Sequence, residues 1–324
     1  MTSLKDITRP IAINLAEFNS LYEETMHSNS LLLDKVLNYI LKTKGKQIRP
    51  ILVLLSAGLS GKINKSTYTA AILIELLHTA TLVHDDVVDE SDRRRGFFSV
   101  NALWKNKVAV LAGDYLLSKG LLVSLQNKEY KYLHLGSDAI QSMSEGELLQ
   151  IKKSRTMNID EETYIAVIRK KTASLFAACC SAGTASTTED NKLIEKMKAF
   201  GENLGMAFQI KDDLLDFDLT NKTGKPTHND LKDRKFSLPL IFTLKNVSFT
   251  EKRHLIGIVK NHNTNKEKIA HLVHRIREEK GFEYTENRMN EYKNKALHIL
   301  SEFPDSAYKK SLEDLVIFIT ERAY

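Results

Sequence analysis

The sequence contains the same acidic pattern twice, at Asp85-Asp86-Val87-Val88-Asp89 and at Asp212-Asp213-Leu214-Leu215-Asp216. Both motifs lie in apolar stretches with helical spacing, so the first and last carboxylates of each fall on one helix face, one turn apart. Unpaired carboxylates at this spacing repel one another, and a hard cation would neutralise them. Magnesium fits, because it accepts one or two carboxylates and completes its shell with water and phosphate oxygens.

Each acidic motif is followed by basic residues. Asp89 leads to Arg93-Arg94-Arg95-Gly96, and Asp216 leads past Lys225 to a second basic run that ends at Lys235. Arg and Lys neutralise phosphate oxygens, and Arg does so with two hydrogen bonds at once. A single acidic motif or charge run is more often a solvated surface, but the same acid-to-base order occurring twice favours a diphosphate site bordering an apolar core.

The elements that must position these motifs are helices. Apolar residues recur at three- and four-residue spacing and strict alternation is nearly absent, so we expect roughly a dozen helices and no sheet. Start signals predict helices that begin at residues 160–162 and 188–190, and a third that runs from about residue 66 to 89. The third carries His78, Thr81 or Leu82, Asp85 and Asp89 on one face. The predicted fold class is an all-α helical bundle around a deep central cavity with an acidic mouth.

Nothing in the composition divides the chain. The 5 prolines are scattered and no Gly/Ser-rich or low-complexity stretch appears, so we expect a single domain over residues 1–324. The first residues lack the pattern of a secretory signal, and no apolar run is long enough to span a bilayer. Cys179 and Cys180 are adjacent and poorly placed to bridge, which predicts core-filling thiols and a cytoplasmic protein.

The charge balance narrows the choice of partners. Basic residues outnumber acidic residues by 47 to 41 and the pI is about 9.0, which suits an anionic partner such as a diphosphate or a membrane surface. Nucleic acid is not expected as a partner, because the basic residues interleave with acids, as in residues 275–280, and no nucleic-acid-binding motif accompanies them.

The complete set of motifs resembles the trans-type polyprenyl diphosphate synthases, which are prenyltransferases of the isoprenoid synthase fold. The resemblance covers nearly the whole chain, and the motifs that carry it are Gly45-Lys46-Gln47-Ile48-Arg49-Pro50, residues 78–89, Arg94-Arg95-Gly96, Gly113-Asp114-Tyr115-Leu116, Lys171-Thr172-Ala173 and residues 205–213. The departures are mild: Gln47 where a basic residue is common, an extra Arg93, and residues 233–237 where the family often has an acid-Gly-Lys-x-Thr run.

The resemblance implies a magnesium site with about three ions. This number fits magnesium, because each ion is usually bound by only one or two carboxylates. Asp85 and Asp89 match the ligands of two ions and Asp212 matches the ligand of a third. Asp86, Asp213 and Asp216 match supporting acids in the same metal-binding motifs. The metals would offset the charge of a departing diphosphate, while the bundle would shield an allylic carbocation from water.

The resemblance also implies two substrate pockets and a homodimer. The residues that match the clamp for an allylic diphosphate, such as farnesyl or geranylgeranyl diphosphate, are Arg94, Lys171, Lys225 and Lys235. Those that match the pocket for isopentenyl diphosphate are Lys46, Arg49, His78 and Arg95. Thr172 and Gln209 match catalytic positions whose oxygens lie near the cationic carbon, which the double bond of isopentenyl diphosphate attacks.

Product length is predicted from the residues that precede the first acidic motif. In short-chain members of the family a bulky aromatic four or five residues before the first Asp closes the cavity, and here those positions are Thr81 and Ala80. Leu77 and Ile74 lie deeper on the same helix and are candidates for the floor. An open wall predicts a product of about six to eight isoprene units along this helix face. The family resemblance implies that such a product serves as an isoprenoid quinone side chain. Such a product is apolar enough to require transient contact with a membrane surface for release.

Other functions stay open at this stage. A short-chain farnesyl or geranylgeranyl diphosphate synthase and a non-catalytic prenyltransferase subunit would share the fold. A terpene cyclase would replace the second acidic motif, and a His-Asp phosphohydrolase, suggested by His84-Asp85, would not use it. Taken one at a time, His78 would be an ordinary core histidine, Lys171 and Thr172 ordinary helix surface, and Gln209 a buried amide bonded to a neighbouring helix.

Overall fold

The computed structural model describes residues 3–43, 45–94, 96–156, 160–217 and 235–321. Two of the expected substrate-binding residues, Arg95 and Lys225, lie outside the described residues. The helices of the first half are α1 (Leu4–Ile7), η1 (Arg9–Ile11), α2 (Ala12–Thr25), α3 (Leu31–Lys42), α4 (Ile48–Ser60), α5 (Lys65–Val88), α6 (Val100–Gln126) and α7 (Tyr130–Thr156). Those of the second half are α8 (Glu161–Ile168), η2 (Arg169–Ala173), α9 (Ser174–Ala185), α10 (Asn191–Asp216), α12 (Leu238–Asn246), α13 (Phe249–Asn261), α14 (Lys266–Glu278), α15 (Gly281–Ser301) and α16 (Ala307–Glu321).

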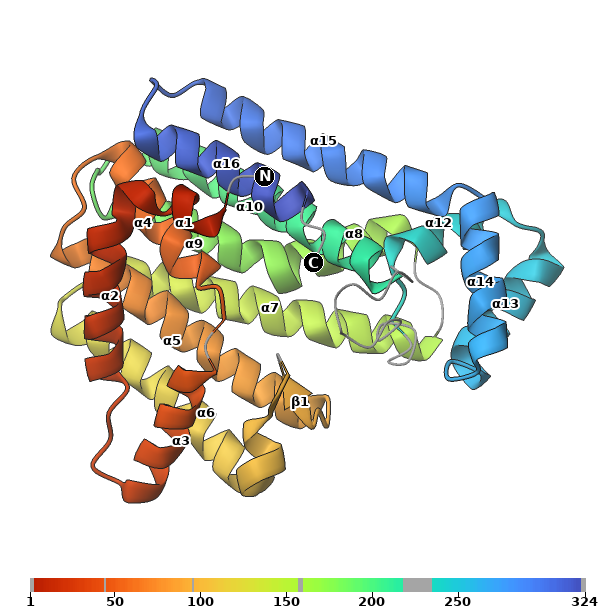
Figure 1. Cartoon of the computed structure of the whole chain (residues 1–324), viewed down its shortest axis with the longest axis horizontal. Coiled ribbons are helices and arrows are strands. Elements are labelled where there is room, and N and C mark those ends of the chain that lie inside the picture. Colours follow the sequence, from red (N-terminus) through yellow and green to blue (C-terminus); the bar gives the residue numbers. More distant parts are fainter. Residues whose placement is uncertain (1–2, 44, 95, 157–159, 218–234, 322–324) are drawn as a thin grey trace.

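The long helices run roughly side by side through the molecule (Figure 1). In that view α5, α7, α9 and α10 cross the middle, α15 and α16 lie along one edge, and α3 and α6 lie along the other. The α13–α14 hairpin projects at one end. The expected all-α bundle is therefore confirmed for the described residues, although it is built from more and shorter helices than the dozen that periodicity suggested.

Helix α9 forms the centre of the core because its side chains are small. All of its residues from Leu175 to Ala185 are buried, and the sequence there is mostly Ala, Ser, Gly and Cys. Neighbouring backbones approach α9 closely: a Cβ added at Gly183 would lie 2.3 Å from the Val53 carbonyl oxygen, and one at Gly201 would lie 2.5 Å from that of Phe176. The two cysteines of α9 are free and buried, as expected, and burial raises the pKa of both thiols.

The expected helix starts are largely confirmed. The Asp160 carboxylate accepts a hydrogen bond from the Thr163 backbone N–H at 2.8 Å, which caps α8, and Asp190 caps α10 in the same way. The first acidic motif ends α5, with Asp89 at its C-cap. The one departure is η2, a π-helical turn in which a continuous helix was expected.

The expectation of no sheet is wrong at one place. Strands β1 (Arg93–Arg94) and β2 (Phe97–Phe98) pair antiparallel directly after the first acidic motif. Gly96 adopts a φ of +83°, which residues with a Cβ rarely adopt, and so allows the chain to reverse within two residues. The pairing is too short to show as a period in the sequence, and it turns the basic run back toward the carboxylates that precede it.

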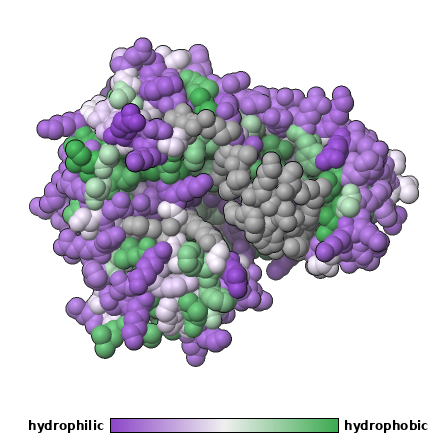
Figure 2. Space-filling view, in the orientation of Figure 1, coloured by the Kyte–Doolittle hydropathy of each residue, from purple (hydrophilic) through white to green (hydrophobic). Residues whose placement is uncertain are grey.

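The expectation that no apolar segment is long enough to span a bilayer is also wrong. Helices α5 and α6 are long and apolar enough to cross a membrane by length and composition alone. The most apolar window of α5 is 78% buried in the molecule, like that of a core helix, whereas that of α6 is only 33% buried. The exposed large apolar residues of α6 are Leu103, Val110, Leu111, Leu121, Leu122 and Leu125. In Figure 2 apolar patches appear in the lower part of the molecule, where α3 and α6 lie.

Candidate active site

The first acidic motif presents its carboxylates in two directions from the end of α5. Asp85 and Asp89 are accessible to solvent, whereas Asp86 is only 4% exposed. The pKa of Asp85 is raised, mainly because burial disfavours its charge and further because Glu147 and Asp89 lie close to it. Lys171 and Arg94 partly offset this effect. Asp85 is therefore a partly desolvated carboxylate among other charges, a setting typical of functional sites.

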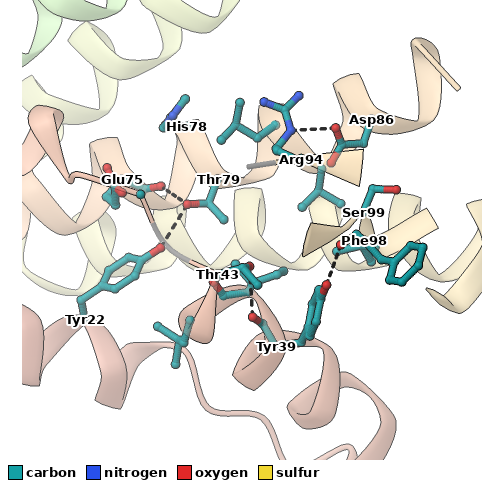
Figure 3. A pocket seen from close by; sticks show the side chains of 16 residues that line it. Tyr22, Tyr39, Thr43, Glu75, His78, Thr79, Asp86, Arg94, Phe98 and Ser99 are labelled. Carbon is teal, nitrogen blue, oxygen red and sulfur yellow. Dashed lines mark hydrogen bonds and ion pairs between the residues drawn. The ribbon is translucent and has the colours of Figure 1, made fainter. Parts of the chain in front are cut away.

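Asp86 holds the β1–β2 hairpin through one of these charges, Arg94. Arg94 Nε donates a hydrogen bond of 2.7 Å to Asp86 Oδ1, and the carboxylate is the more buried partner of this ion pair. Figure 3 shows the pair at the edge of a cavity between α2, α3, α5 and the hairpin. The same cavity, of about 80 Å³, is lined by Gly45 and His78. The hairpin thus brings Arg94 to the same cavity as His78 and the Gly45-Lys46 segment.

Of the other basic residues expected at the isopentenyl diphosphate pocket, Lys46 and Arg49 flank the start of α4. The Lys46 ammonium lies 5.4 Å from the centre of the Phe318 ring, and the Arg49 guanidinium lies 5.7 Å from that of Phe176. Gln47 between them has a φ of 52°, and its side-chain amide donates to Asn19 Oδ1 at 2.8 Å. This left-handed residue starts α4 abruptly, so the basic residues are fixed by the turn and by aromatic faces.

The second acidic motif is anchored by a directed chain of hydrogen bonds. Thr172 Oγ1 donates to Gln209 Oε1 at 2.8 Å, and Gln209 Nε2 donates to Asp213 Oδ1 at 3.2 Å. The other oxygen of Asp213 accepts from the Tyr164 hydroxyl at 2.8 Å and from the Leu238 backbone N–H at 3.1 Å. Asp213 is 3% exposed, so its charge is stabilised by these donors. Asp212 and Asp216 are half-buried on the same last turns of α10.

The π-helical turn η2 places Lys171 and Thr172 at this wall. Lys171 Nζ donates to Gln150 Oε1 at 2.9 Å and is ion-paired with Glu147. Both partners belong to α7, which packs against both α5 and η2. A π turn inserts one residue into the helix, which turns neighbouring side chains toward different neighbours and is common at functional sites.

Two further cavities connect the acidic motifs. One, of about 190 Å³, is lined by Lys171, Thr172, Gln209 and Asp213. The other, of about 530 Å³, is lined by Asp89, Glu147 and Lys260. Both are also lined by Gln150 and Lys235, so they adjoin. The structure therefore brings together the first acidic motif, the Lys171–Thr172 turn, the second motif and Lys235, which lie far apart in the sequence.

The donor set at the mouth suits a hard divalent cation. Asp85 and Asp89 offer carboxylate oxygens from adjacent turns, and the burial that raises the pKa of Asp85 would favour binding of a cation there. Within the described residues, no three His, Cys, Asp or Glu side chains are grouped as a complete metal site. Asp86 and Asp213 differ from the other four acids in burial, because both are almost inaccessible to solvent. The chemistry of the accessible acids therefore fits magnesium that takes its remaining ligands from diphosphate and water.

The four residues expected to measure the product lie on the N-terminal side of Asp85 in α5. Ala80, Leu77 and Ile74 are buried, and the Thr81 hydroxyl donates to the His78 carbonyl at 2.8 Å. Leu77 packs against α7, where a Cβ added at Gly136 would lie 2.7 Å from Leu77 Cδ1. None of the four residues lines the three cavities described above.

Three residues of this site were not found from the sequence: Glu147, Gln150 and Tyr164. Glu147 and Gln150 lie three residues apart in α7, so they share a helix face, which is a signal that the sequence did offer. Tyr164 gave no signal, because an isolated Tyr in a helix is usually core. Only the packing of α8 against α10 shows that its hydroxyl meets Asp213.

Comparison with known proteins places this arrangement in a family. The model of the polyprenyl synthetase family matches residues 30–276. The octaprenyl diphosphate synthase of Escherichia coli is 33% identical, with 99% of each chain covered. Among solved structures, a decaprenyl diphosphate synthase from Rhodobacter capsulatus superposes with a TM-score of 0.92 and 30% identity, over 98% of this chain and 99% of that one. A geranylgeranyl pyrophosphate synthase from Bacteroides thetaiotaomicron is 37% identical, with a TM-score of 0.83 over 98% and 99% of the two chains.

Proposed function

The chain belongs to the polyprenyl synthetase family, and from this premise we propose that it joins isopentenyl diphosphate to an allylic diphosphate to make all-trans polyprenyl diphosphates. The observation that carries this proposal is the pair of adjoining cavities, which link the first acidic motif to the wall formed by Thr172, Gln209 and Asp213. A prenyltransferase needs this combination of a cationic and acidic mouth, for a diphosphate, next to a wall with oriented side-chain oxygens, for a carbocation.

In this mechanism Lys171 and Lys235, which line the same cavity, bind the allylic diphosphate together with Arg94. Loss of the diphosphate leaves a cation at the allylic carbon, near the oxygens of Thr172 and Gln209. The hydrogen bond between these side chains fixes their orientation before reaction, so little reorganisation is needed as charge develops. The terminal double bond of isopentenyl diphosphate attacks this carbon, and the departing diphosphate takes the proton that is lost as the new trans double bond forms.

Magnesium is part of this proposal. Asp85 and Asp89 would hold two ions and Asp212 a third, and the ions would offset the charge of the leaving diphosphate. Asp86, Asp213 and Asp216 would support them. For Asp86 and Asp213 this role is favoured by their burial and by their bonds to Arg94 and to Tyr164, because the other acids are more accessible to an ion.

We further propose a medium- or long-chain product that serves as the side chain of an isoprenoid quinone. The support is the small side chain of Ala80 and the full-length similarity to an octaprenyl diphosphate synthase. The alternative is a short-chain product, which the similarity to a geranylgeranyl pyrophosphate synthase keeps open. The test is incubation of the purified protein with magnesium, farnesyl diphosphate and labelled isopentenyl diphosphate. Absence of any elongated product would contradict the proposed reaction, and products that end at four isoprene units would contradict the proposed length.

The two substrate pockets give a separate prediction. We expect Arg49→Ala to raise the KM for isopentenyl diphosphate about tenfold or more, because a charge-assisted hydrogen bond to phosphate is lost, while the KM for the allylic substrate changes little. Lys235→Ala should instead raise the KM chiefly for the allylic substrate, because Lys235 lines the cavity with Thr172 and Gln209. Steady-state kinetics with each substrate varied in turn measures both constants. If each variant raised the KM for both substrates equally, the basic residues would form one shared binding surface and not two pockets.

We propose that the protein is a homodimer, formed through the exposed apolar face of α6. Leu111 is 66% exposed and Leu122 is 49% exposed on this helix, and contiguous apolar surface of this kind is typical of protein interfaces. The double substitution Leu111→Glu with Leu122→Glu should convert the dimer to a monomer, measured by size-exclusion chromatography with light scattering. Ile13→Glu is the matched control, because Ile13 is 83% exposed on α2 and lies outside this face. A wild-type protein that is already monomeric would refute the proposed dimer.

We place the protein in the cytoplasm, with transient contact to a membrane surface when the product leaves. The two free thiols of α9 suit a reducing compartment. In this proposal the α13–α14 hairpin provides the membrane contact, because its exposed residues include several cations, and Figure 2 shows a largely hydrophilic surface there. These exposed cations are Lys252, Arg253, Lys260, Lys266 and Arg277.

A further inference from the structure

Two acidic residues of α7 reach two consecutive lysines of η2, on opposite sides of a close helix contact. Glu145 pairs with Lys170 at 2.5 Å, and Glu147 pairs with Lys171. Gly146 lies between them, and a Cβ added there would lie 2.9 Å from the Lys171 backbone nitrogen. The backbones of α7 and η2 therefore touch at Gly146. The flanking carboxylates point to either side of this contact.

The two pairs differ in what they face. The Glu145–Lys170 pair lines an outer groove with Arg169 and Glu202, and roughly half of each side chain is exposed. An exposed ion pair of this kind contributes little to the stability of the fold. The Glu147–Lys171 pair is more buried, with 25% and 32% of the side chains exposed, and it lines the two adjoining cavities of the candidate active site.

Glu147 lies beside the first acidic motif, because it lines one of the adjoining cavities together with Asp89, and its partner Lys171 lines the other. Gln150 adds a second acceptor for the same ammonium, with Lys171 Nζ donating to its Oε1 at 2.9 Å. The ammonium of Lys171 is thus bound by two side chains of α7.

We propose that Glu147 is a positioning residue that holds Lys171 while the diphosphate site is empty and competes with diphosphate for its charge. The proposal rests on the proposed function, in which Lys171 binds the allylic diphosphate. The Glu147 carboxylate opposes an incoming anion and supports an incoming cation beside Asp85. It therefore makes the binding of diphosphate depend on the metal, and it gives Lys171 a partner to return to when diphosphate leaves.

This role predicts two effects of opposite sign for Glu147→Gln, which keeps the shape and hydrogen-bonding atoms of the side chain but removes its charge. Inorganic diphosphate should bind about five- to tenfold more tightly without metal, because Lys171 loses a competing anion. The magnesium concentration needed for half-maximal diphosphate-dependent metal binding should rise about five- to tenfold, because the mouth loses one negative charge. Isothermal titration calorimetry measures both constants without turnover.

Matched variants separate this role from a purely structural one. Glu147→Asp keeps the charge and should restore both constants to within about twofold of the wild type. Glu145→Gln removes the carboxylate of the neighbouring pair and should change neither. If Glu147→Gln weakened both diphosphate binding and magnesium binding, or strengthened both, the pair would only join two helices. A lowered Tm with both binding constants unchanged would show the same. If the wild type binds diphosphate but elongates no substrate, the proposed function fails. If it elongates normally and Glu147→Gln binds like the wild type, only this inference fails.

Discussion

Asp85→Ala should lower kcat by about a thousandfold or more, because it removes a ligand whose effect is greatest in the transition state for loss of diphosphate. The same variant should unfold at the wild-type temperature or above it. Burial and the neighbouring acids raise the pKa of Asp85 in the folded protein, so its ionisation opposes folding at every pH above its normal range. Loss of activity together with unchanged or higher stability is expected of a residue retained for function.

Asp86→Ala provides the contrast one residue away. Asp86 is buried and bonded to Arg94, so its removal leaves the guanidinium without this partner and should cost about 2 kcal/mol or more of the free energy of unfolding. Asp138→Ala is the neutral control, since Asp138 is 60% exposed and pairs only loosely with His134. Turnover with saturating magnesium and thermal unfolding should be measured on all three. Near-normal turnover in Asp85→Ala would refute the assignment of the first acidic motif.

The sequence was sufficient to predict only in part which acids within each motif are accessible and which are buried. The repeated Asp-Asp-x-x-Asp pattern and its helical setting indicated a metal site, because residues three and four apart share a helix face. Which acid of each motif would be buried depended on partners more distant in sequence. Arg94 reaches Asp86 through a two-residue strand pairing, and Tyr164 reaches Asp213 across 49 residues of sequence. Periodicity carries no information on such pairs.

The errors in the fold have a similar origin. The β1–β2 hairpin depends on one glycine with positive φ and is too short to produce an alternating pattern. The π turn at η2 adds one residue to a helix whose apolar spacing is otherwise regular, so it too is invisible in the sequence. Both irregular elements lie at the candidate active site. Local rules of sequence fail most often at such places, because function there requires a geometry that regular elements do not provide.

The product length depends on whether Ala80 faces the growing chain or only packs in the core. Ala80 is fully buried, three residues after Leu77 and four before His84. Glycines of α6 meet both of those neighbours: a Cβ added at Gly113 would lie 2.1 Å from His84 Nε2, and one at Gly120 would lie 3.7 Å from Leu77 Cδ2. Ala80 therefore lies on the face of α5 that approaches α6.

Ala80→Tyr should shorten the products to about four isoprene units or fewer, because a ring at this position, just over one turn from Asp85, would block the path of a chain anchored at the acidic mouth. The first condensation should proceed at close to the wild-type rate, since its product ends before this layer. Chromatography of the dephosphorylated products measures the lengths, and Ala80→Val tests whether the shift increases with side-chain volume. Overpacking of the core predicts a different result, in which the Tm falls and products of every length decrease together. A distribution that Ala80→Tyr leaves unchanged, in a protein of wild-type stability, would show that this wall does not limit the chain.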